Sequence, residues 1–237
     1  MCLASRAAAV LFWLAVRRWA PKQTLPSSPE ILRVSSEAPE PHVIDYAASF
    51  ISRGRVIAIP TDTFYGLCAD PFNLYAVERV FLLKGRPETR ALPILVNSIE
   101  QAVTLVRDVP DAFLNLAHKF WPGALTLVVE ATHRLPLKVT GNTGRVALRW
   151  ADSRIATALI QAAECPVTGT SANLSSHPSC TNPDQIVQQL GDRVPLILDA
   201  GDTGGTLAST IVRIDGDSWS IARQGAIRDE EIYRAFS

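Results

Sequence analysis

The sequence has no excess of charge of either sign, because 23 lysine and arginine residues balance 23 aspartate and glutamate residues in a chain of 237. Proteins that hold nucleic acid through its phosphate backbone usually carry a basic excess. Stable binding of tRNA by charge alone is therefore not expected. Net charge does not describe how charges are distributed, so a local basic patch can still hold a triphosphate.

Cysteine and histidine are also scarce, with four residues of each. The cysteines show neither CxxC spacing nor the density of a disulfide scaffold, which favours a reducing compartment. The histidines do not pair with other ligand residues at metal-binding spacing, so we expect no structural metal. Walker A, GxGxxG and GxSxG patterns are absent from the sequence. A bound nucleotide would therefore be held by scattered strand ends, and no covalent serine intermediate is expected.

The apolar run from Ala7 to Val16 is too short to cross a bilayer as a helix. It is similar to a signal-peptide core but lacks a convincing cleavage site. Three interpretations stay open: a targeting or interfacial segment, a mis-assigned start codon, and export. The stretch from Pro21 to Pro41 is rich in proline and serine and indicates a linker. We expect a cytoplasmic protein without stable membrane association.

Strand and helix signals alternate from about Ile31 onwards and predict a layered α/β domain. Buried strands are expected where short apolar runs occur, and helices where apolar residues recur at helical spacing. The expected strands are Val56–Pro60, Leu92–Val96, Leu125–Glu130, Arg145–Trp150, Pro166–Thr170, Leu196–Asp199, Ser209–Asp215 and Trp219–Arg223. The expected helices are Leu74–Leu83, Ile99–Val106, Asp111–Phe120, Ser153–Ala163, Pro183–Leu190 and one from Asp229.

Four segments beside these strands are unusually rich in small polar residues, glycine and cations. Polar side chains at the ends of buried strands lie where an open α/β sheet binds its ligands. We therefore expect these segments to form a site. They are PTDTFYGL (Pro60–Leu67), KGRP (Lys84–Pro87), TSANLSS (Thr170–Ser176) and STIVRID (Ser209–Asp215).

The first two segments suit a polar ligand with an anionic part. Thr61, Asp62 and Thr63 offer short hydrogen-bonding groups, although for an isolated TDT a helix cap with a turn is the more common explanation. Lys84 and Arg86 repel each other unless an anion, such as a triphosphate, lies between them. The alternative for this pair is a solvated helix end whose cations meet the helix dipole.

The other two segments also offer groups for a phosphate or a ribose. Ser171 and Asn173 are two residues apart, so in extended backbone their side chains point the same way. Arg223 ends a later strand and could meet a phosphate, whereas Arg213 could be a charge on the face of the sheet. No histidine near Ser171 is an evident base, which argues against a serine nucleophile.

Taken together and in this order, the segments closely resemble the YrdC/TsaC family of threonylcarbamoyl-AMP synthases. Six motifs carry the resemblance, which runs from about Arg33 to the C-terminus. It implies one α/β domain, residues 31–237, with a twisted mixed parallel/antiparallel sheet around a concave groove; residues 1–30 would be the apolar segment and linker. The six are PTDTFYGL, KGRP, FWPGALTLV (Phe120–Val128), VALR (Val146–Arg149), TSANLSS, and STIVRID followed by IARQG.

The resemblance also implies the roles of single residues. Thr61, Arg149 and Ser209 would bind L-threonine, with Arg149 as the partner of its carboxylate. The catalytic residues that bind the phosphates of ATP would be Lys84, Arg86, Ser171 and Asn173, and further contacts to the nucleotide would come from Thr181 and Arg223. No protein residue is assigned to a metal; Mg²⁺ would share the charge of the phosphates.

The implied reaction joins L-threonine, bicarbonate or CO₂, and ATP into threonylcarbamoyl-AMP and pyrophosphate. The protein would contribute positioning and positive charge rather than a nucleophile. A separate threonylcarbamoyl transferase would then use the short-lived adenylate to modify tRNA beside the anticodon. Three positions depart from the family pattern, namely Ala91, Thr170 and Arg145; the long Arg145 side chain would either add a phosphate contact or point outward.

Three other functions remain alternatives. A concave basic groove could bind double-stranded RNA or tRNA without turnover, although the zero net charge argues against it. A carbamoyl-transfer relative, as in hydrogenase maturation, normally sits in a much larger chain with acylphosphatase and zinc-finger parts. A paralogue of different activity would share the same motifs.

Overall fold

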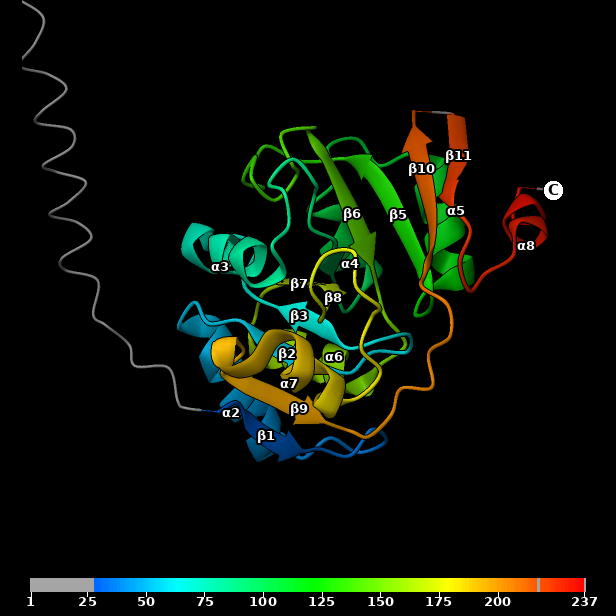
Figure 1. Cartoon of the computed structure of the whole chain (residues 1–237). Coiled ribbons are helices and arrows are strands. Elements are labelled where there is room, and N and C mark those ends of the chain that lie inside the picture. The colour runs from blue at the N-terminus through cyan, green and yellow to red at the C-terminus, as the bar shows by residue number, and fades with distance from the viewer. Residues whose placement is uncertain (1–27, 217, 237) are drawn as a thin grey trace, which may run out of the picture.

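The computed structural model describes residues 28–216 and 218–236. They form two mixed β-sheets, seen in the lower and upper halves of Figure 1. The apolar run Ala7–Val16 lies outside the described residues. The five-stranded sheet has the order β1 (Glu30–Arg33), β9 (Leu196–Asp199), β2 (Ile57–Ile59), β3 (Gly66–Cys68) and β8 (Thr170–Ser171). The six-stranded sheet has the order β11 (Ser218–Arg223), β10 (Thr210–Asp215), β5 (Leu125–Glu130), β6 (Arg145–Arg149), β4 (Ile94–Leu95) and β7 (Val167–Thr168).

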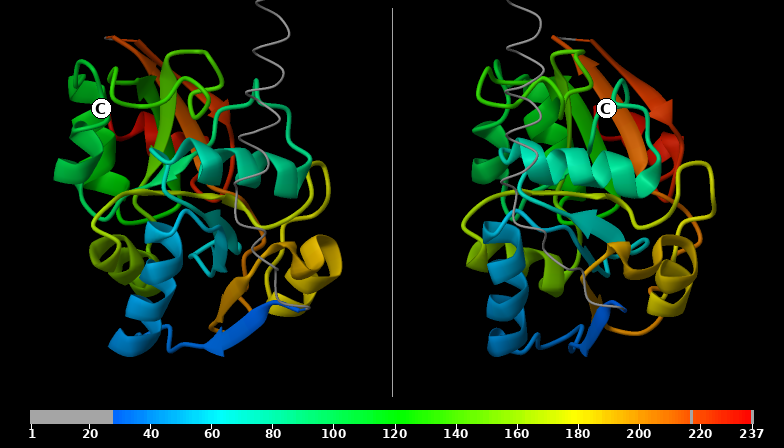
Figure 2. Two further views of the ribbon diagram at one scale, coloured as in Figure 1. Left: turned by 90° about the vertical axis from the view of Figure 1, so that its left-hand side faces the viewer. Right: turned by 60° about the vertical axis from the view of Figure 1, so that its left-hand side comes forward.

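Helices cover the two sheets, and α3 lies across the middle of the molecule between them (Figure 2). Parallel and antiparallel pairs occur in both sheets, which confirms the α/β class with mixed pairing. Among the described residues no helix is both long and apolar enough to cross a bilayer. The helices are α2 (Pro41–Ser52), α3 (Leu74–Lys84), α4 (Ile99–Val103), α5 (Asp111–Phe120), α6 (Arg154–Ala162), α7 (Pro183–Leu190) and α8 (Asp229–Tyr233), with a 3₁₀ turn at Gly191–Arg193.

Local sequence fixes both ends of α3. The Asn73 side chain accepts hydrogen bonds from Tyr75 N and Ala76 N at 3.1 and 3.2 Å, which satisfies two amides that have no partner inside the helix. Gly85 ends the helix at φ 56°, in the left-handed region that glycine adopts without a steric cost. The last helical residue is therefore Lys84, one residue beyond the predicted end at Leu83.

The expected strand Pro166–Thr170 is wrong, because the chain changes sheets within it. Strand β7 pairs with β4 in the six-stranded sheet, whereas β8 pairs with β3 in the five-stranded sheet. Gly169 lies at the crossing, where an added Cβ would stand 2.5 Å from Leu95 Cγ. Only glycine permits this close approach, and so the two sheets can share one stretch of chain.

The linker expected from Pro21 to Pro41 is also wrong in part. Strand β1 forms four residues within it, pairing in parallel with β9. Helix α2 follows and was not expected; its buried face repeats at helical spacing through Val43, Ala47 and Ile51. Proline is tolerated at the first turn of a helix, so Pro41 starts this one rather than ending a linker.

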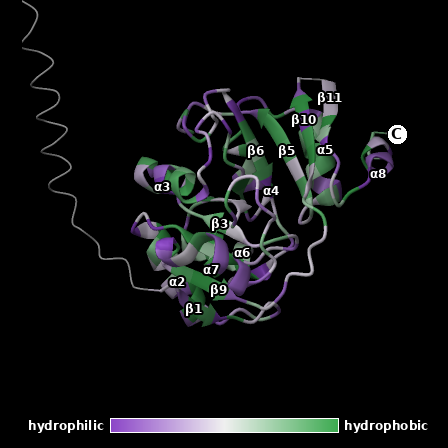
Figure 3. Cartoon of the chain, viewed as in Figure 1, coloured by the Kyte–Doolittle hydropathy of each residue, from purple (hydrophilic) through white to green (hydrophobic). Residues whose placement is uncertain are grey.

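The interior is divided into two apolar clusters. The larger one packs α3 and α5 against β5, β6 and β10. The smaller one packs α2 and α6 against β2 and β9. Figure 3 shows the hydrophobic colour gathered on the strands that run through these clusters. The two clusters hold the two sheets as rigid supports for the loops between them.

Candidate active site

A cavity of about 310 Å³ lies where loops from the two sheets meet. Its wall includes the turn after β2, the loop after α3, the faces of β5 and β6, and the entry to β10. The sequence-predicted residues that line it are Thr61, Arg86, Arg149, Ser171, Ser209 and Arg223. The tertiary structure therefore brings together residues up to 162 positions apart, from Thr61 to Arg223 (223 − 61).

Arg149, in the wall of this cavity, joins its own strand β6 to two other segments of the chain. Its guanidinium donates to Gly123 O at 3.0 Å, to Thr63 Oγ1 at 3.0 Å and to Asp62 Oδ1 at 2.5 Å. Only 8% of the residue is exposed. Three of the five guanidinium N–H groups are thus used, leaving two for a ligand. The predicted contact with a substrate carboxylate stays a prediction, and bracing of the Asp62 turn is a further task of this side chain.

Thr61 and Thr63 form a turn between two strands rather than a helix cap. Thr61 Oγ1 donates to Phe64 O at 2.7 Å and accepts from Thr63 N at 3.2 Å. Strand β3 follows directly and pairs antiparallel with β2. The alternative interpretation of this segment, a helix cap with a turn, is therefore correct about the turn and wrong about the helix cap.

Arg86 and Arg223 contribute charge that no carboxylate offsets. Arg86 donates to Ala91 O at 2.8 Å and Arg223 to Ser209 O at 2.7 Å, and among the described residues neither forms an ion pair. Burial lowers the pKa of both arginines, and a second cation lowers each further: Arg90 beside Arg86, and Arg149 beside Arg223. An anion bound in the cavity would relieve this desolvation and repulsion.

Lys84 and Asn173 lie directly behind Ser171 rather than in the cavity wall. Lys84 Nζ donates to Asn173 O at 2.9 Å, to Asn173 Oδ1 at 3.1 Å and also to Ser171 O. Only 3% of Lys84 is exposed, and burial, followed by the charge of Arg86, lowers its pKa to about 7. Lys84 therefore fixes the backbone that carries the Ser171 hydroxyl.

Ser171 and Asn173 meet, but not for the reason that their spacing suggests. Strand β8 ends at Ser171, and Asn173 N donates to Ser171 O at 3.0 Å, so the chain turns instead of remaining extended. The Ser171 hydroxyl then donates to Asn173 Oδ1. The expectation of extended backbone is wrong, whereas the proximity of the two side chains is confirmed.

Two other predicted positions lie away from the cavity wall. The Thr181 hydroxyl donates to Asp202 Oδ2 at 3.0 Å, and Thr181 is not among the residues that line the cavity. Arg145 forms an ion pair with Asp215 and donates to Ile214 O at 3.3 Å. Arg145 does not line the cavity, so of its two alternatives the structure favours an outward-pointing side chain over a phosphate contact. Arg213 likewise pairs with Asp215, at 2.8 Å, as a charge on the sheet.

Sequence reasoning missed one polar side chain on the cavity wall. Thr126 contacts Ser209, whereas Thr63, which the sequence did indicate, anchors Arg149. Thr126 is a buried polar residue in a strand whose neighbours are apolar. That break in an apolar run was a usable signal, because a buried hydroxyl requires a partner.

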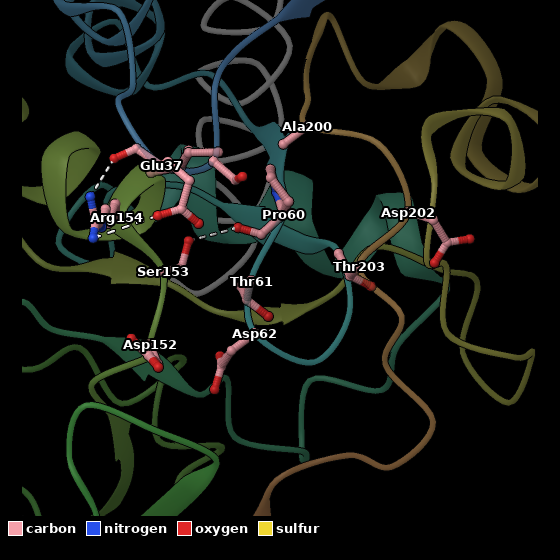
Figure 4. A pocket seen from close by; sticks show the side chains of 12 residues that line it. Glu37, Pro60, Thr61, Asp62, Asp152, Ser153, Arg154, Ala200, Asp202 and Thr203 are labelled. Atoms are coloured by element: carbon pink, nitrogen blue, oxygen red, sulfur yellow. Dashed lines mark hydrogen bonds and ion pairs between the residues drawn. The ribbon is translucent and has the colours of Figure 1, made fainter.

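A second, wider hollow of about 430 Å³ opens on the other side of the Thr61–Asp62 turn. Figure 4 shows Ser153 donating to Pro60 O, at 3.2 Å, and Glu37 in contact with Arg154, at 3.5 Å. Its other charged wall residues are Asp62, Asp152 and Asp202. The negative charge of this hollow contrasts with the arginines of the first cavity, which is therefore the better place for phosphates. Among the described residues, no group of three or more His, Cys, Asp or Glu is arranged to hold a metal ion.

Comparison with known proteins places the chain in a family. A family model named Sua5_yciO_yrdC and described as "Telomere recombination" matches residues 49–225, which is more than half of the chain. The chain belongs to the Sua5/YciO/YrdC family. The match includes the cavity residues from Thr61 to Arg223. The predicted relationship to the YrdC-type proteins is thus confirmed.

Named members of the Sua5/YciO/YrdC family resemble the chain over most of its length. A curated threonylcarbamoyl-AMP synthase of Pyrococcus abyssi is 38% identical over 191 residues, and one of Bacillus subtilis is 36% identical over 190 residues. Each alignment covers 80% of this chain. The chain spans only about half the length of these relatives, 56% and 55% respectively.

Solved structures of the family show the same fold. P. abyssi Sua5 complexed with L-threonine matches with a TM-score of 0.83 at 36% identity, over 86% of this chain and 60% of that one. Escherichia coli YciO matches with a TM-score of 0.77 over 84% of this chain and 96% of that one. Its identity is 22%, so that likeness shows the fold alone.

Proposed function

We propose that the protein is an L-threonylcarbamoyladenylate synthase, which makes threonylcarbamoyl-AMP and pyrophosphate from L-threonine, bicarbonate or CO₂, and ATP. The observation that carries this proposal is the presence of three guanidinium groups, those of Arg86, Arg149 and Arg223, around one small cavity with hydroxyl groups. Such a wall suits a carboxylate and phosphates together. The names of the P. abyssi and B. subtilis relatives, and the complex of P. abyssi Sua5 with L-threonine, support it.

The amino acid would lie on the side of the cavity formed by Thr61, Arg149 and Ser209. The two N–H groups of Arg149 that remain free can hold its carboxylate. The nitrogen of the substrate attacks the carbon of CO₂ and loses a proton, which gives a carbamate. Because the turn at Thr61 and the guanidinium of Arg149 are hydrogen-bonded to each other through Thr63, they form one preorganised surface for this step.

The phosphates would lie on the side formed by Arg86, Ser171 and Arg223, with Thr181 as a more distant contact of the nucleotide. A carbamate oxygen attacks the α-phosphorus of ATP, the bond to the bridging oxygen breaks, and pyrophosphate leaves. Arg86 and Arg223 stabilise the negative charge on the phosphate oxygens. Lys84 and Asn173 hold Ser171 in place, and Lys84 adds positive charge from behind it. Mg²⁺ would arrive with ATP as part of the substrate.

The proposed cellular role follows from the reactivity of the product. A mixed anhydride of a carbamate and AMP is short-lived, so a separate threonylcarbamoyl transferase would take it and modify tRNA beside the anticodon. This role requires a cytoplasmic enzyme whose catalytic domain is residues 31–237, with residues 1–30 outside it. The protein needs no stable contact with tRNA, in agreement with its zero net charge.

The direct test is incubation of the protein with ATP, bicarbonate and L-threonine. Release of pyrophosphate is expected to require all three substrates, and mass spectrometry should detect threonylcarbamoyl-AMP. Consumption of carbamoyl phosphate instead would favour the carbamoyl-transfer alternative. Tight, salt-sensitive binding of double-stranded RNA without pyrophosphate release would favour the RNA-binding alternative.

The low pKa of Lys84 predicts how ATP affinity depends on pH. Its value of about 7 in the free protein reflects burial and the charge of Arg86. A bound triphosphate favours the ammonium and so raises this pKa, which couples ATP binding to proton uptake. Above pH 7 the affinity is therefore expected to fall, by at most about tenfold per pH unit. Isothermal titration of ATP between pH 6.5 and 9 measures this slope.

The matched control for this pH dependence is Lys84→Arg, whose guanidinium keeps its charge across the range. Ionisation of ATP itself affects both proteins equally and cancels in the comparison. The variant is expected to show a flatter profile than the unmodified protein. Identical slopes in the two proteins would mean that Lys84 does not take up the proton.

A further inference from the structure

The floor of the active-site cavity contains a buried pair of hydroxyl groups. Thr126 Oγ1 and Ser209 Oγ lie 2.8 Å apart, and the two residues are 4% and 7% exposed. Thr126 lies on β5, while Ser209 immediately precedes β10. Both residues line the cavity. A polar pair buried this deeply in an apolar sheet face has to be satisfied by its surroundings or by a ligand.

One of the two hydroxyl hydrogens of this pair remains without an acceptor among the described residues. Two hydroxyl groups carry two hydrogens, and one of these is used between them. Arg223 Nη2 lies 3.3 Å from Ser209 Oγ and can only donate, so it supplies no acceptor. In the part of the chain that the structure describes, neither hydroxyl donates to any other group. The remaining hydrogen is therefore available to a ligand in the cavity.

The position of the pair indicates which part of a ligand it meets. Leu127 pairs with Leu148 across β5 and β6, so the next residues along these antiparallel strands, Thr126 and Arg149, are neighbours. Ser171 and Arg86, on the proposed phosphate side, come from other segments of the wall. The free donor thus lies next to Arg149, where the side proposed for the amino acid adjoins Arg223 of the side proposed for the phosphates.

We propose that Thr126 is a positioning residue that directs the Ser209 hydroxyl towards the β-hydroxyl group of the amino-acid substrate. The 2.8 Å contact between the two hydroxyl groups allows either one to be the donor. In the proposed arrangement Thr126 is the donor to Ser209 Oγ, which also accepts from Arg223, and the Ser209 hydrogen is then free to donate to the substrate oxygen. Through this bond the pair selects β-hydroxy amino acids over amino acids of the same shape without the hydroxyl. The inference rests on the proposed function and names the specificity element of its amino-acid site.

The test compares Thr126→Val, which keeps the shape but removes the hydroxyl, with Thr126→Ser, which keeps the hydroxyl. Calorimetric binding and pyrophosphate release are measured with L-threonine and with L-2-aminobutyrate, its analogue without a hydroxyl. Thr126→Val is expected to weaken binding of L-threonine and lower its kcat/KM by about 10- to 100-fold, with L-2-aminobutyrate changed by less than about threefold. Thr126→Ser is expected to restore the preference for L-threonine.

Each other outcome has a defined meaning. An equal loss with both amino acids would show a merely structural role and overturn the inference, as would weaker ATP binding with unchanged amino-acid preference. Thr126→Ala, measured in the same way, replaces Thr126→Val if the latter does not fold. If the unmodified protein neither binds L-threonine nor releases pyrophosphate, the proposed function itself fails; if it does both, only the role of Thr126 is at stake.

Discussion

An Arg149→Ala variant is expected to lose about 3 kcal/mol of unfolding free energy and nearly all of the proposed synthase activity. The substitution leaves the Asp62 carboxylate, whose side chain is 16% exposed, without its partner. It also leaves Gly123 O and Thr63 Oγ1 without their donor, and it removes the group proposed to hold the substrate carboxylate. Chemical denaturation measures the first effect, and threonine-dependent pyrophosphate release measures the second.

Arg154→Ala is the matched control for this prediction. Arg154 pairs with Glu37 at 3.5 Å, but the two side chains are 68% and 81% exposed. A surface pair of this kind contributes about 0–1 kcal/mol. Unchanged stability of Arg149→Ala would contradict the role of Arg149 as a brace of the Asp62 turn. Activity comparable to that of Arg154→Ala would contradict its proposed contact with the substrate carboxylate. Arg149→Lys keeps the charge but cannot form the three-way fork, so it should restore little of either property.

Arg86→Ala is expected to lower threonine-dependent pyrophosphate release by about 100- to 1,000-fold while the fold stays intact. Within residues 28–216 and 218–236, Arg86 donates only to main-chain oxygens of its own loop, those of Arg90 and Ala91, so little of the described fold depends on it. Its desolvated charge faces the cavity, and no carboxylate of these residues pairs with it. The loss should therefore appear in ATP turnover and not in the thermal midpoint.

Arg90→Ala, in the same loop, is the control for Arg86→Ala. Arg90 is exposed and does not line the cavity, so its loss should change activity by less than about threefold. Near-normal activity of Arg86→Ala, or an equal loss in both variants, would contradict the phosphate role of Arg86. Lys84→Ala cannot serve the same purpose, because it would leave three buried acceptors around Ser171 and Asn173 without a donor and destabilise the protein.

Secondary structure was predictable where one periodic signal was strong and where its ends were marked. Helices α5 and α7 and strands β5 and β9 have the predicted bounds. Ser153 caps α6 as expected, accepting from Ala156 N at 3.2 Å. Strand β1 and helix α2 were obscured by prolines, although their apolar spacing was present. The division of the expected strand Pro166–Thr170 could not be predicted, because it depends on which sheet offers each partner.

The composition of the active site was predictable to a similar degree. Six of the nine predicted site residues line one cavity, and two more, Lys84 and Asn173, support Ser171 from behind. Polar strand ends indicated four of the segments, and the resemblance to the YrdC/TsaC family, carried by the order of six motifs, supplied the full set of residues and their roles. It could not indicate that Arg149 is already bound to Asp62, since the two are 87 positions apart.

The sequence by itself therefore determined the secondary-structure elements and the polar loops from which the candidate site is built, because hydrophobic period, caps and polar strand ends are local properties of the chain. Only the tertiary structure decided which of those side chains face the cavity and which serve as supports. Orientation and burial depend on contacts between distant segments, such as Thr126 with Ser209 or Lys84 with Ser171. No local pattern contains those contacts, because the packing of the two sheets creates them.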